Sequence, residues 1–319
     1  MSALIEGVHL KKYFKTPNGV LHAVDDVNFS IEKGTTLGVV GESGCGKSTL
    51  GLLLLHLHSL TAGQIIFDGK DITNVKGKEL KEIRRDMQMI FQDPYSSINP
   101  RMPIEDIIAE PFHIYGICKS SAEISAKVKS LMDTVGLAER LSNAYPHELD
   151  GGRRQRVGIA RALALNPKFI VCDEPVSALD VSIQAQILNL MQDLQKERGL
   201  TYIFITHDLS VVKHISDEIC VMYLGQIVEQ APAKELFANP IHPYTQALLS
   251  AIPKPKVPRV ENRIILKGEL TSPIEPKPGC RFASRCIYAT EECRKADPQK
   301  TQVGDGHFVY CYRSQGMRS

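Results

Sequence analysis

The sequence lacks the features that mark several broad classes of protein. Its 319 residues carry 38 basic and 36 acidic side chains with the two signs interspersed, so the net charge of +2 gives no reason to expect nucleic acid as a partner. The N-terminus has neither the basic start nor the apolar core of a secretory signal. The leucine run at residues 52–55 is far too short to span a bilayer. We therefore expect a cytoplasmic protein.

Cysteine is present, but the tight C-x2-4-C pair typical of zinc sites is missing. In a cytoplasmic protein, the eight cysteines are expected to be thiols or metal ligands rather than disulfides. Four of them follow the spacing C-x5-C-x6-C-x17-C in a polar segment rich in Pro and Gly: Cys280, Cys286, Cys293 and Cys311. Four thiolates can hold zinc or an iron–sulfur cluster, and free thiols are the third alternative.

The length and the hydrophobic patterns predict an α/β protein with an appendage. Short strands separated by turns at residues 3–40 and 62–70 indicate an antiparallel layer, whereas residues 102–165 are helical in pattern. Three apolar strands then alternate with helices, which is typical of a parallel sheet covered on both faces. Their ranges are 169–172, 202–206 and 218–222. A Pro- and Lys-rich linker begins near residue 253, so we predict domains at 1–255 and 256–319.

A phosphate-binding loop is the most informative motif of the chain. The pattern G-x4-G-K-[ST] is formed by Gly41, Glu42, Ser43, Gly44, Cys45, Gly46, Lys47, Ser48 and Thr49. An apolar strand at 36–40 precedes it and a helix at 50–56 follows, which makes an ordinary Gly-rich turn a weaker interpretation. In such a loop the backbone N–H groups surround phosphates, Lys47 reaches the β- and γ-phosphates, and the Ser48 hydroxyl is a ligand of Mg²⁺.

Other polar residues follow apolar strands at what would be the same edge of a parallel sheet. Asp173 can hold Mg²⁺ there, and Glu174 can polarise a water for attack on the γ-phosphate. His207 ends the next strand and can contact the γ-phosphate. Gln92 also follows an apolar run and can hold Mg²⁺ or the attacking water. Each residue alone could be a helix cap or a structural residue, but together they predict hydrolysis of a nucleotide.

These motifs resemble, in order, those of the ATP-binding-cassette (ABC) ATPases over residues 4 to about 255. The Leu-Ser-Gly-Gly-Gln segment of that family matches Leu149, Asp150, Gly151, Gly152 and Arg153, and the loop after Glu174 ends at Asp180. Phrases at 91–94, 173–186 and 239–245, with the cysteine tail, are most similar to the oligopeptide/dipeptide importer branch, in its F-type subunit. The resemblance implies a P-loop NTPase fold with a RecA-like parallel core, an antiparallel β layer, a helical subdomain at about 96–160 and a small cysteine-containing domain.

The resemblance also implies cofactors, partners and further site residues. Two such ATPases pair head to tail, here with a D-type subunit, and each ATP lies between one phosphate loop and the partner's Leu-x-Gly-Gly-x segment. The pair docks on two permeases at the cytoplasmic face of the membrane, in a complex served by an extracytoplasmic binding protein. Phe14, or as second choice Tyr13, stacks on adenine, and residues 95–115 receive a permease helix. In that branch the four cysteines are associated with a [4Fe–4S] cluster.

Some alternatives remain open from the sequence. The substrate is expected to be an oligopeptide or dipeptide, with nickel or glutathione as alternatives. A non-transport ABC ATPase usually carries a coiled-coil insert or a second cassette, and neither is present. A P-loop kinase would leave residues 149–153 and the cysteines unexplained.

The chain departs from the family pattern at two places. Asp150 and Arg153 replace Ser and Gln, and a carboxylate cannot donate a proton to a phosphate, so we expect the site that Asp150 completes to be slow. The alternative is that Asp150 is a simple helix N-cap.

Cys45 lies inside the phosphate loop, where we expect Lys47 and the helix N-terminus to lower the thiol pKa and favour alkylation. The alternative there is a small filler equivalent to Ser.

Overall fold

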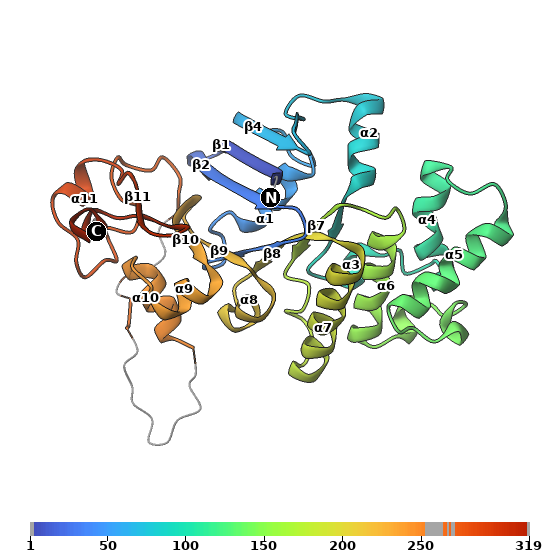
Figure 1. The fold of residues 1–319 in the computed structure, drawn as a ribbon. Helices are drawn as coiled ribbons and strands as arrows, with labels where there is room; N and C mark the ends of the chain where they lie inside the picture. Colours follow the sequence, from blue (N-terminus) through green and yellow to red (C-terminus); the bar gives the residue numbers. More distant parts are fainter. Residues whose placement is uncertain (1–2, 253–263, 267, 269–271, 318–319) are drawn as a thin grey trace, which may run out of the picture. The chain divides into compact units, whose positions relative to one another are not determined.

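The computed structural model describes residues 3–252, 264–266, 268 and 272–317 and divides into two compact units (Figure 1). The first unit comprises Met1–Asn74 and Phe204–Ser319, and the second comprises Val75–Ile203. Strand β8 (Thr201–Thr206) contains one of the boundaries between them. Among the described residues, no helix has both the length and the hydropathy needed to cross a bilayer.

An antiparallel sheet in the order β2-β1-β4-β5 forms one layer of the first unit. Its strands are β1 (Ala3–Thr16), β2 (Gly19–Glu32), β4 (Ala62–Phe67) and β5 (Lys70–Asp71). The period-two pattern is clear at the end of β2, where Val27, Phe29 and Ile31 are buried between polar neighbours. This layer confirms the expectation from the N-terminal strand pattern.

The second sheet of the first unit combines parallel and antiparallel pairs in the order β11-β12-β10-β9-β3. Strand β3 is parallel to β9, and the other neighbours are antiparallel. The strands are β3 (Thr36–Val40), β9 (Glu218–Tyr223), β10 (Gln226–Pro232), β11 (Lys300–Gly304) and β12 (His307–Tyr310). The helices of this unit are α1 (Lys47–Leu54), α8 (Leu209–Ile215), α9 (Ala233–Ala238), α10 (Pro243–Ser250) and α11 (Glu292–Lys295), with a 3-10 helix, η3 (Tyr312–Met317).

A buried ion pair attaches the C-terminal hairpin to this sheet. His307 on β12 contacts Glu229 on β10 at 2.8 Å between Nε2 and Oε1, and both side chains are almost fully buried. The same carboxylate accepts hydrogen bonds from the backbone N–H groups of Ile241 and His242 at 2.8 and 3.0 Å. A buried charge is stable only when it is paired and hydrogen-bonded, and Glu229 meets that condition. The cysteine-bearing end of the chain thus extends the sheet of the first unit.

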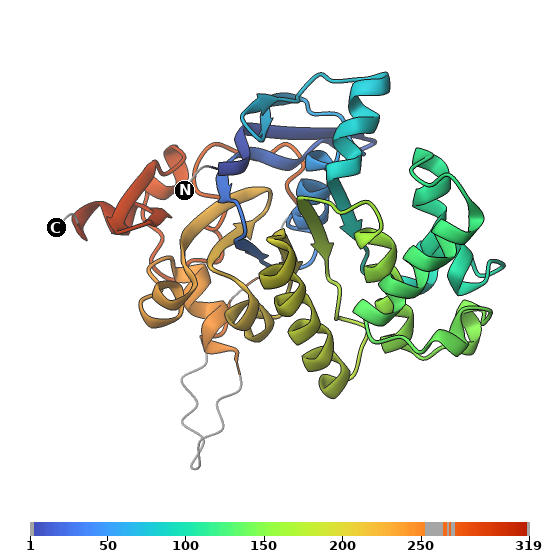
Figure 2. The same ribbon diagram turned by 45° about the vertical axis from the view of Figure 1, so that its right-hand side comes forward.

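The second unit is mainly helical around a parallel strand pair. Strand β6 (Met87–Ile90) lies parallel to β7 (Phe169–Asp173), whose five residues are all buried. The helices are α2 (Gly77–Asp86), α3 (Pro94–Ser97), α4 (Ile104–Tyr115), α5 (Ser121–Thr134), α6 (Gly151–Leu163) and α7 (Val181–Arg198), with 3-10 turns η1 (Glu139–Leu141) and η2 (Pro146–Glu148). Helices α4, α5 and α6 pack on one another, as Figure 2 shows, and confirm the predicted helical segment.

The α/β fold class and the predicted strands are confirmed, with ends that agree or differ by one residue. The helix of the phosphate loop begins at Lys47, earlier than its apolar pattern indicates, because polar residues form its first turn. The linker near residue 253 lies outside the described residues. The domain boundary at 255/256 stays a prediction.

Candidate functional site

The phosphate loop of the first unit connects β3 to α1 as the motif predicts. Gly46 is the N-cap of α1 and has the left-handed φ of 103°, which side chains rarely tolerate. A Cβ atom at this position would lie 2.0 Å from the carbonyl oxygen of Ala23. Only glycine therefore allows the loop to lie this close to β2 and turn directly into the helix.

Lys47 is folded back onto the loop itself. Its side chain is 5% exposed, and its Nζ donates hydrogen bonds to the carbonyl oxygens of Gly41 at 2.8 Å and Glu42 at 3.0 Å. The ammonium is thus held in the loop at the N-terminus of α1, where backbone N–H groups and the helix dipole favour an anion. This arrangement can bind the phosphates of a nucleotide.

Two contacts to Glu42 come from the far end of the chain. The backbone N–H of Glu42 donates to the hydroxyl oxygen of Tyr244 at 2.9 Å. The Glu42 carboxylate forms a two-pronged ion pair with the guanidinium of Arg285, at 2.6 and 3.1 Å. The sequence analysis did not identify Tyr244 or Arg285. The available signals were that Tyr244 lies in the phrase at 239–245 and that Arg285 stands beside Cys286.

Cys45 does not have the lowered pKa that we expected. Its side chain is 1% exposed, and burial raises the pKa of the thiol, while the charge of Lys47 acts in the opposite direction but is outweighed. The expectation was wrong because the sequence shows the neighbouring cation but not the burial. The small-filler interpretation of Cys45 agrees with this environment.

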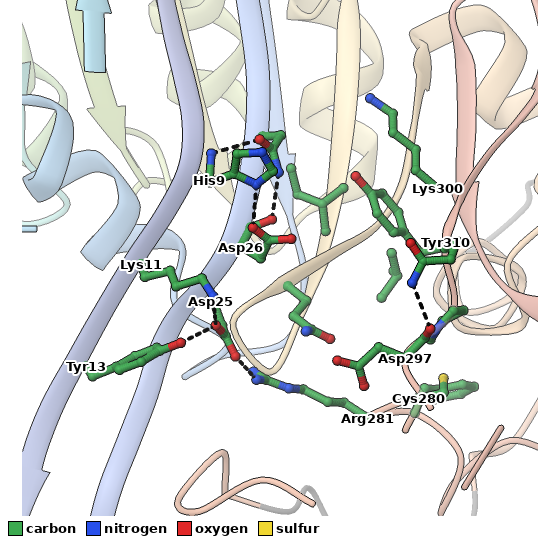
Figure 3. A pocket seen from close by; sticks show the side chains of 17 residues that line it. His9, Lys11, Tyr13, Asp25, Asp26, Cys280, Arg281, Asp297, Lys300 and Tyr310 are labelled. Carbon is green, nitrogen blue, oxygen red and sulfur yellow. Dashed lines mark hydrogen bonds and ion pairs between the residues drawn. The ribbon is translucent and has the colours of Figure 1, made fainter. Parts of the chain in front are cut away.

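The two aromatic candidates for adenine differ in their surroundings. The Tyr13 ring stacks on His22, with 3.9 Å between the ring centroids. The Tyr13 hydroxyl donates a hydrogen bond to Asp25, as Figure 3 shows. The Phe14 ring meets His58 edge-on and carries the ammonium of Lys12 at 4.9 Å from its centroid. Both rings therefore have partners in the structure, and Phe14 as the stacking residue stays a prediction.

His207 lies directly after β8 and is exposed, as expected for a residue that meets a ligand. The next residue, Asp208, is the N-cap of α8 and accepts a hydrogen bond from the backbone N–H of Ser210 at 2.7 Å. This cap fixes the turn on which His207 stands.

The second unit brings two of the predicted residues together. Because β6 and β7 are parallel, Gln92 and Glu174 follow them at the same edge, and Gln92 Nε2 donates to Glu174 Oε2 at 2.9 Å. Asp173 ends β7 and is 8% exposed. Glu174 has a positive φ of 44°, which is uncommon for a residue with a side chain and frequent at functional sites. Amide and carboxylate groups so placed can orient a water molecule.

The segment at residues 149–153 forms the start of α6. Asp150 is the N-cap, and its Oδ1 accepts a hydrogen bond from the backbone N–H of Arg153 at 2.8 Å. The Nε atom of Arg153 lies 3.4 Å from the Oδ2 atom of Asp150. A Cβ atom at Gly152 would lie 2.6 Å from Ile183, so the glycine allows α6 to approach α7. Asp180 caps α7, and hydrogen bonds from Ser182 and Ile183 lower the pKa of its carboxyl.

The four C-terminal cysteines line one cavity of about 170 Å³. Burial raises the pKa of Cys280 to about 12 and also raises those of Cys286 and Cys311, and negative charges on neighbouring thiols act in the same direction. Within the part of the chain that the structure describes, no three His, Cys, Asp or Glu side chains form a group that could hold a metal ion. The thiols thus suit zinc or an iron–sulfur cluster in number and chemistry, but they are not drawn together as a ligand set.

Comparison with known proteins identifies the family. The model for "ABC transporter" matches residues 24–177, and that for "Oligopeptide/dipeptide transporter, C-terminal region" matches residues 228–293. The chain is 50% identical to the oligopeptide transport ATP-binding protein AppF of Bacillus subtilis, with 97% of each chain covered. It is 52% identical to OppF of the same organism, covering 98% of this chain and 97% of OppF.

Solved structures agree with this result. The dimeric post-hydrolysis structure of the ATP-binding cassette MJ0796, bound to ADP and Pi, matches with a TM-score of 0.66 at 29% identity. The match covers 72% of this chain and 98% of that one. The protein therefore belongs to the ABC ATPases, within the family of oligopeptide transport ATP-binding proteins.

Proposed function

We propose that this chain is the ATP-hydrolysing subunit that drives import of oligopeptides or dipeptides across the cytoplasmic membrane. The observation that carries the proposal is the phosphate loop, in which the buried Lys47 donates hydrogen bonds to two carbonyl oxygens of the loop. Peptides are favoured over nickel or glutathione because the relatives that match nearly end to end are named for oligopeptide transport.

Each site residue has a separate task in this proposal. Lys47 and the loop amides bind the phosphates, and Phe14 stacks on adenine. Ser48 and Asp173 are the residues that would hold Mg²⁺, and the ion would supply positive charge to the phosphates. Glu174 orients the attacking water and accepts its proton, with Gln92 holding the Glu174 carboxylate. His207 contacts the γ-phosphate.

Glu174→Gln tests the catalytic part of the proposal. The amide keeps the size of the side chain but cannot accept a proton, so we expect ATP binding to persist while kcat falls by about 100-fold or more. Binding of a fluorescent ATP analogue and release of phosphate are measured on the transporter assembled in membranes. Glu197→Gln, at an exposed position on α7, is the matched control. Hydrolysis by Glu174→Gln at the wild-type rate would remove Glu174 from this role.

The proposed partners are a D-type ATPase, two permeases and, through the complex, an extracytoplasmic binding protein. The match to a cassette described as dimeric supports pairing of two ATPases. Exposed apolar side chains at Phe91, Tyr95 and Ile114, in or beside residues 95–115, support docking of a permease helix on the cytoplasmic face. Tagged full-length chain is expected to co-purify from membranes with both permeases and the second ATPase. Recovery of a homodimer without membrane subunits would contradict this assembly.

We further propose that the two ATP sites of the assembly are unequal. Asp150 has no proton to donate to a phosphate held by the partner, and its carboxylate adds like charge at that site. The site that uses this chain's own phosphate loop and Glu174 relies on the partner's segment and is the faster one. Arg153, which pairs with Asp150, reduces the repulsion without removing it.

The four C-terminal cysteines are proposed to hold a [4Fe–4S] cluster with a structural role. Their arrangement around one cavity supports a shared ligand, and four thiolates are the usual donor set for such a cluster. Protein purified without oxygen is expected to be brown and to contain iron and acid-labile sulfide, both lost on Cys293→Ser. Cys118→Ser, outside this group, serves as control. Stoichiometric zinc without iron would identify the alternative metal, and no metal at all would leave free thiols.

A further inference from the structure

Arg285 forms an enclosed ion pair with the phosphate loop. Its two terminal nitrogens meet the two carboxylate oxygens of Glu42 at 2.6 and 3.1 Å, and the side chains are 9% and 29% exposed. A guanidinium matches a carboxylate in this two-pronged geometry, which a lysine cannot reproduce. The contact joins residues 243 positions apart. It is therefore a tertiary restraint on the loop rather than a product of local sequence.

Glu42 is held at three points in total. Its carboxylate forms the ion pair, its backbone N–H donates to Tyr244, and its carbonyl oxygen accepts from Lys47 and from the backbone N–H of Cys45. Tyr244 in turn packs against Phe282, with ring centroids 5.4 Å apart, and both rings are buried. Phe282 and Arg285 belong to one short segment between two cysteines, which we call the cysteine turn (residues 280–286). The position of Glu42 thus depends on the cysteine turn.

A second arginine of the cysteine turn contacts strand β2 directly and strand β1 through Tyr13. Arg281 donates to the carboxylate of Asp25 and to the carbonyl oxygen of Leu224, and Asp25 also accepts from the Tyr13 hydroxyl. Figure 3 shows Tyr13 and Arg281 meeting the Asp25 carboxylate from opposite sides. Burial tends to raise the pKa of Asp25, but hydrogen bonds from Tyr13 and His22 and the charge of Arg281 outweigh it and lower that pKa. Asp25 is consequently a charged link between the cysteine turn and the strand that carries Phe14.

The charge of Glu42 needs compensation if the loop is to bind a triphosphate. The negative charge of Glu42 acts inside the loop. Burial is the largest cause of the raised pKa of the Cys45 thiol, and the charge of Glu42 raises it further. A nucleotide triphosphate is an anion, so an unpaired carboxylate on the loop would oppose its binding. Arg285 is the cation in ion-pair contact with that carboxylate.

We propose that the cysteine turn supports the nucleotide site, with Arg285 and Arg281 as positioning residues. Arg285 neutralises Glu42 and holds its carboxylate away from the phosphates, while Arg281 fixes β1 through Asp25. This inference rests on the proposed binding of ATP. It gives the cysteine-bearing segment a role in nucleotide affinity, whether or not those cysteines hold a metal.

Arg285→Ala is the main test, made on the purified full-length chain with a fluorescent ATP analogue. We expect the Kd for ATP to rise about tenfold, with the loss smaller at high salt because the repulsion is then screened. The double variant Arg285→Ala/Glu42→Gln removes the unpaired charge and should regain affinity to within about threefold of wild type. Arg285→Gln keeps hydrogen-bond donors without the charge, and serves if the alanine variant fails to fold. Lys295→Ala is the control, because Lys295 forms an exposed ion pair with Glu291 in the same part of the chain.

Two further readouts separate positioning from simple anchoring of the C-terminal segment. Arg285→Ala should weaken inorganic triphosphate about as much as ATP, whereas Arg281→Ala should weaken ATP more than triphosphate, since β1 carries the adenine partner. In the assembled transporter, Arg285→Ala should raise the KM for ATP more than it lowers kcat. A melting temperature that falls while the Kd for ATP stays within twofold of wild type would overturn the proposal, as would a double variant no better than Arg285→Ala. If the wild-type chain bound no ATP, the proposed function itself would fail first.

Discussion

The phosphate loop and the segment at residues 149–153 are held in opposite ways. Lys47 is 5% exposed, and the loop is restrained by Tyr244 and Arg285, which lie 202 and 243 residues away from Glu42 in the chain. The side chains of Asp150 and Arg153 are 60% and 49% exposed, and they form an ion pair with each other. One element is organised by tertiary contacts, and the other by a local helix cap.

The difference agrees with the tasks proposed for the two elements. A loop that binds a flexible triphosphate gains affinity when its hydrogen-bond donors are fixed beforehand, because the loop then loses less conformational entropy on binding. A segment that meets ATP on another subunit has to stay accessible until the two subunits pair. Its own fold therefore relies on contacts within one turn of helix.

The largest expected effect is on stability and concerns His242. This residue is the N-cap of α10, the helix that carries Tyr244, which holds the phosphate loop. Burial lowers its pKa to about 4. A pKa below the unfolded value of 6.5 means that the unfolded chain binds a proton first, so stability is lost as pH falls from about 6.5 to 4. The loss is up to about 3 kcal/mol at 1.36 kcal/mol per pKa unit.

The corresponding variant is His242→Asn, since Asn can accept the N-cap hydrogen bond from Tyr244 but does not titrate. Urea unfolding of wild type and variant at pH 7 and pH 4.5 measures the difference. The variant should lose clearly less stability than wild type over this range. An equal loss in both proteins would show that His242 is not the titrating group.

Lys47→Ala tests the rigid loop directly. Removing the ammonium should weaken ATP binding by about 100-fold, equivalent to about 2.7 kcal/mol, because a charge-assisted contact to phosphate is lost. Titration with a fluorescent ATP analogue gives the Kd. Lys234→Ala, at an exposed position on α9, is the control. If Lys47→Ala kept its affinity, the buried lysine would be only a structural link between loop carbonyls.

Asp150→Ser tests the exposed segment. In an assembled transporter that carries Glu174→Gln, the remaining turnover comes from the site that Asp150 completes. Serine can still cap α6 and restores a hydroxyl donor, so we expect this residual turnover to rise about tenfold, or 1.4 kcal/mol. Asp193→Ser on α7 is the control. No increase would mean that Asp150 only caps the helix, and that the two sites need not differ.

The smallest effect is expected at Cys45. Because the thiol is buried and its pKa raised, alkylation of the folded chain should label Cys118 well before Cys45, with or without ATP. Peptide mapping by mass spectrometry follows both residues in one sample. Rapid labelling of Cys45 that ATP prevents would show that the loop opens far enough to expose it.

The sequence was sufficient wherever the signal is local. The glycines and Lys47 of the phosphate loop, the buried strand before Asp173 and the helical pattern within residues 102–165 were each predicted from neighbouring residues. Hydrophobic periodicity and sequence motifs indicate local backbone geometry, and the structure has these elements at the predicted places. Parallel pairing of apolar strands was also predictable, and with it the meeting of Gln92 and Glu174 at one edge.

Contacts between distant parts of the chain were decided only by the tertiary structure. The pairing of β12 with β10, the ion pair of Arg285 with Glu42 and that of Arg281 with Asp25 join residues that no spacing rule connects. The Cys45 thiol shows the same limit, because Lys47 is visible in the sequence whereas the burial that dominates its pKa is not. Sequence patterns encode what each segment can form, and packing decides which side chains lose water and which charges meet.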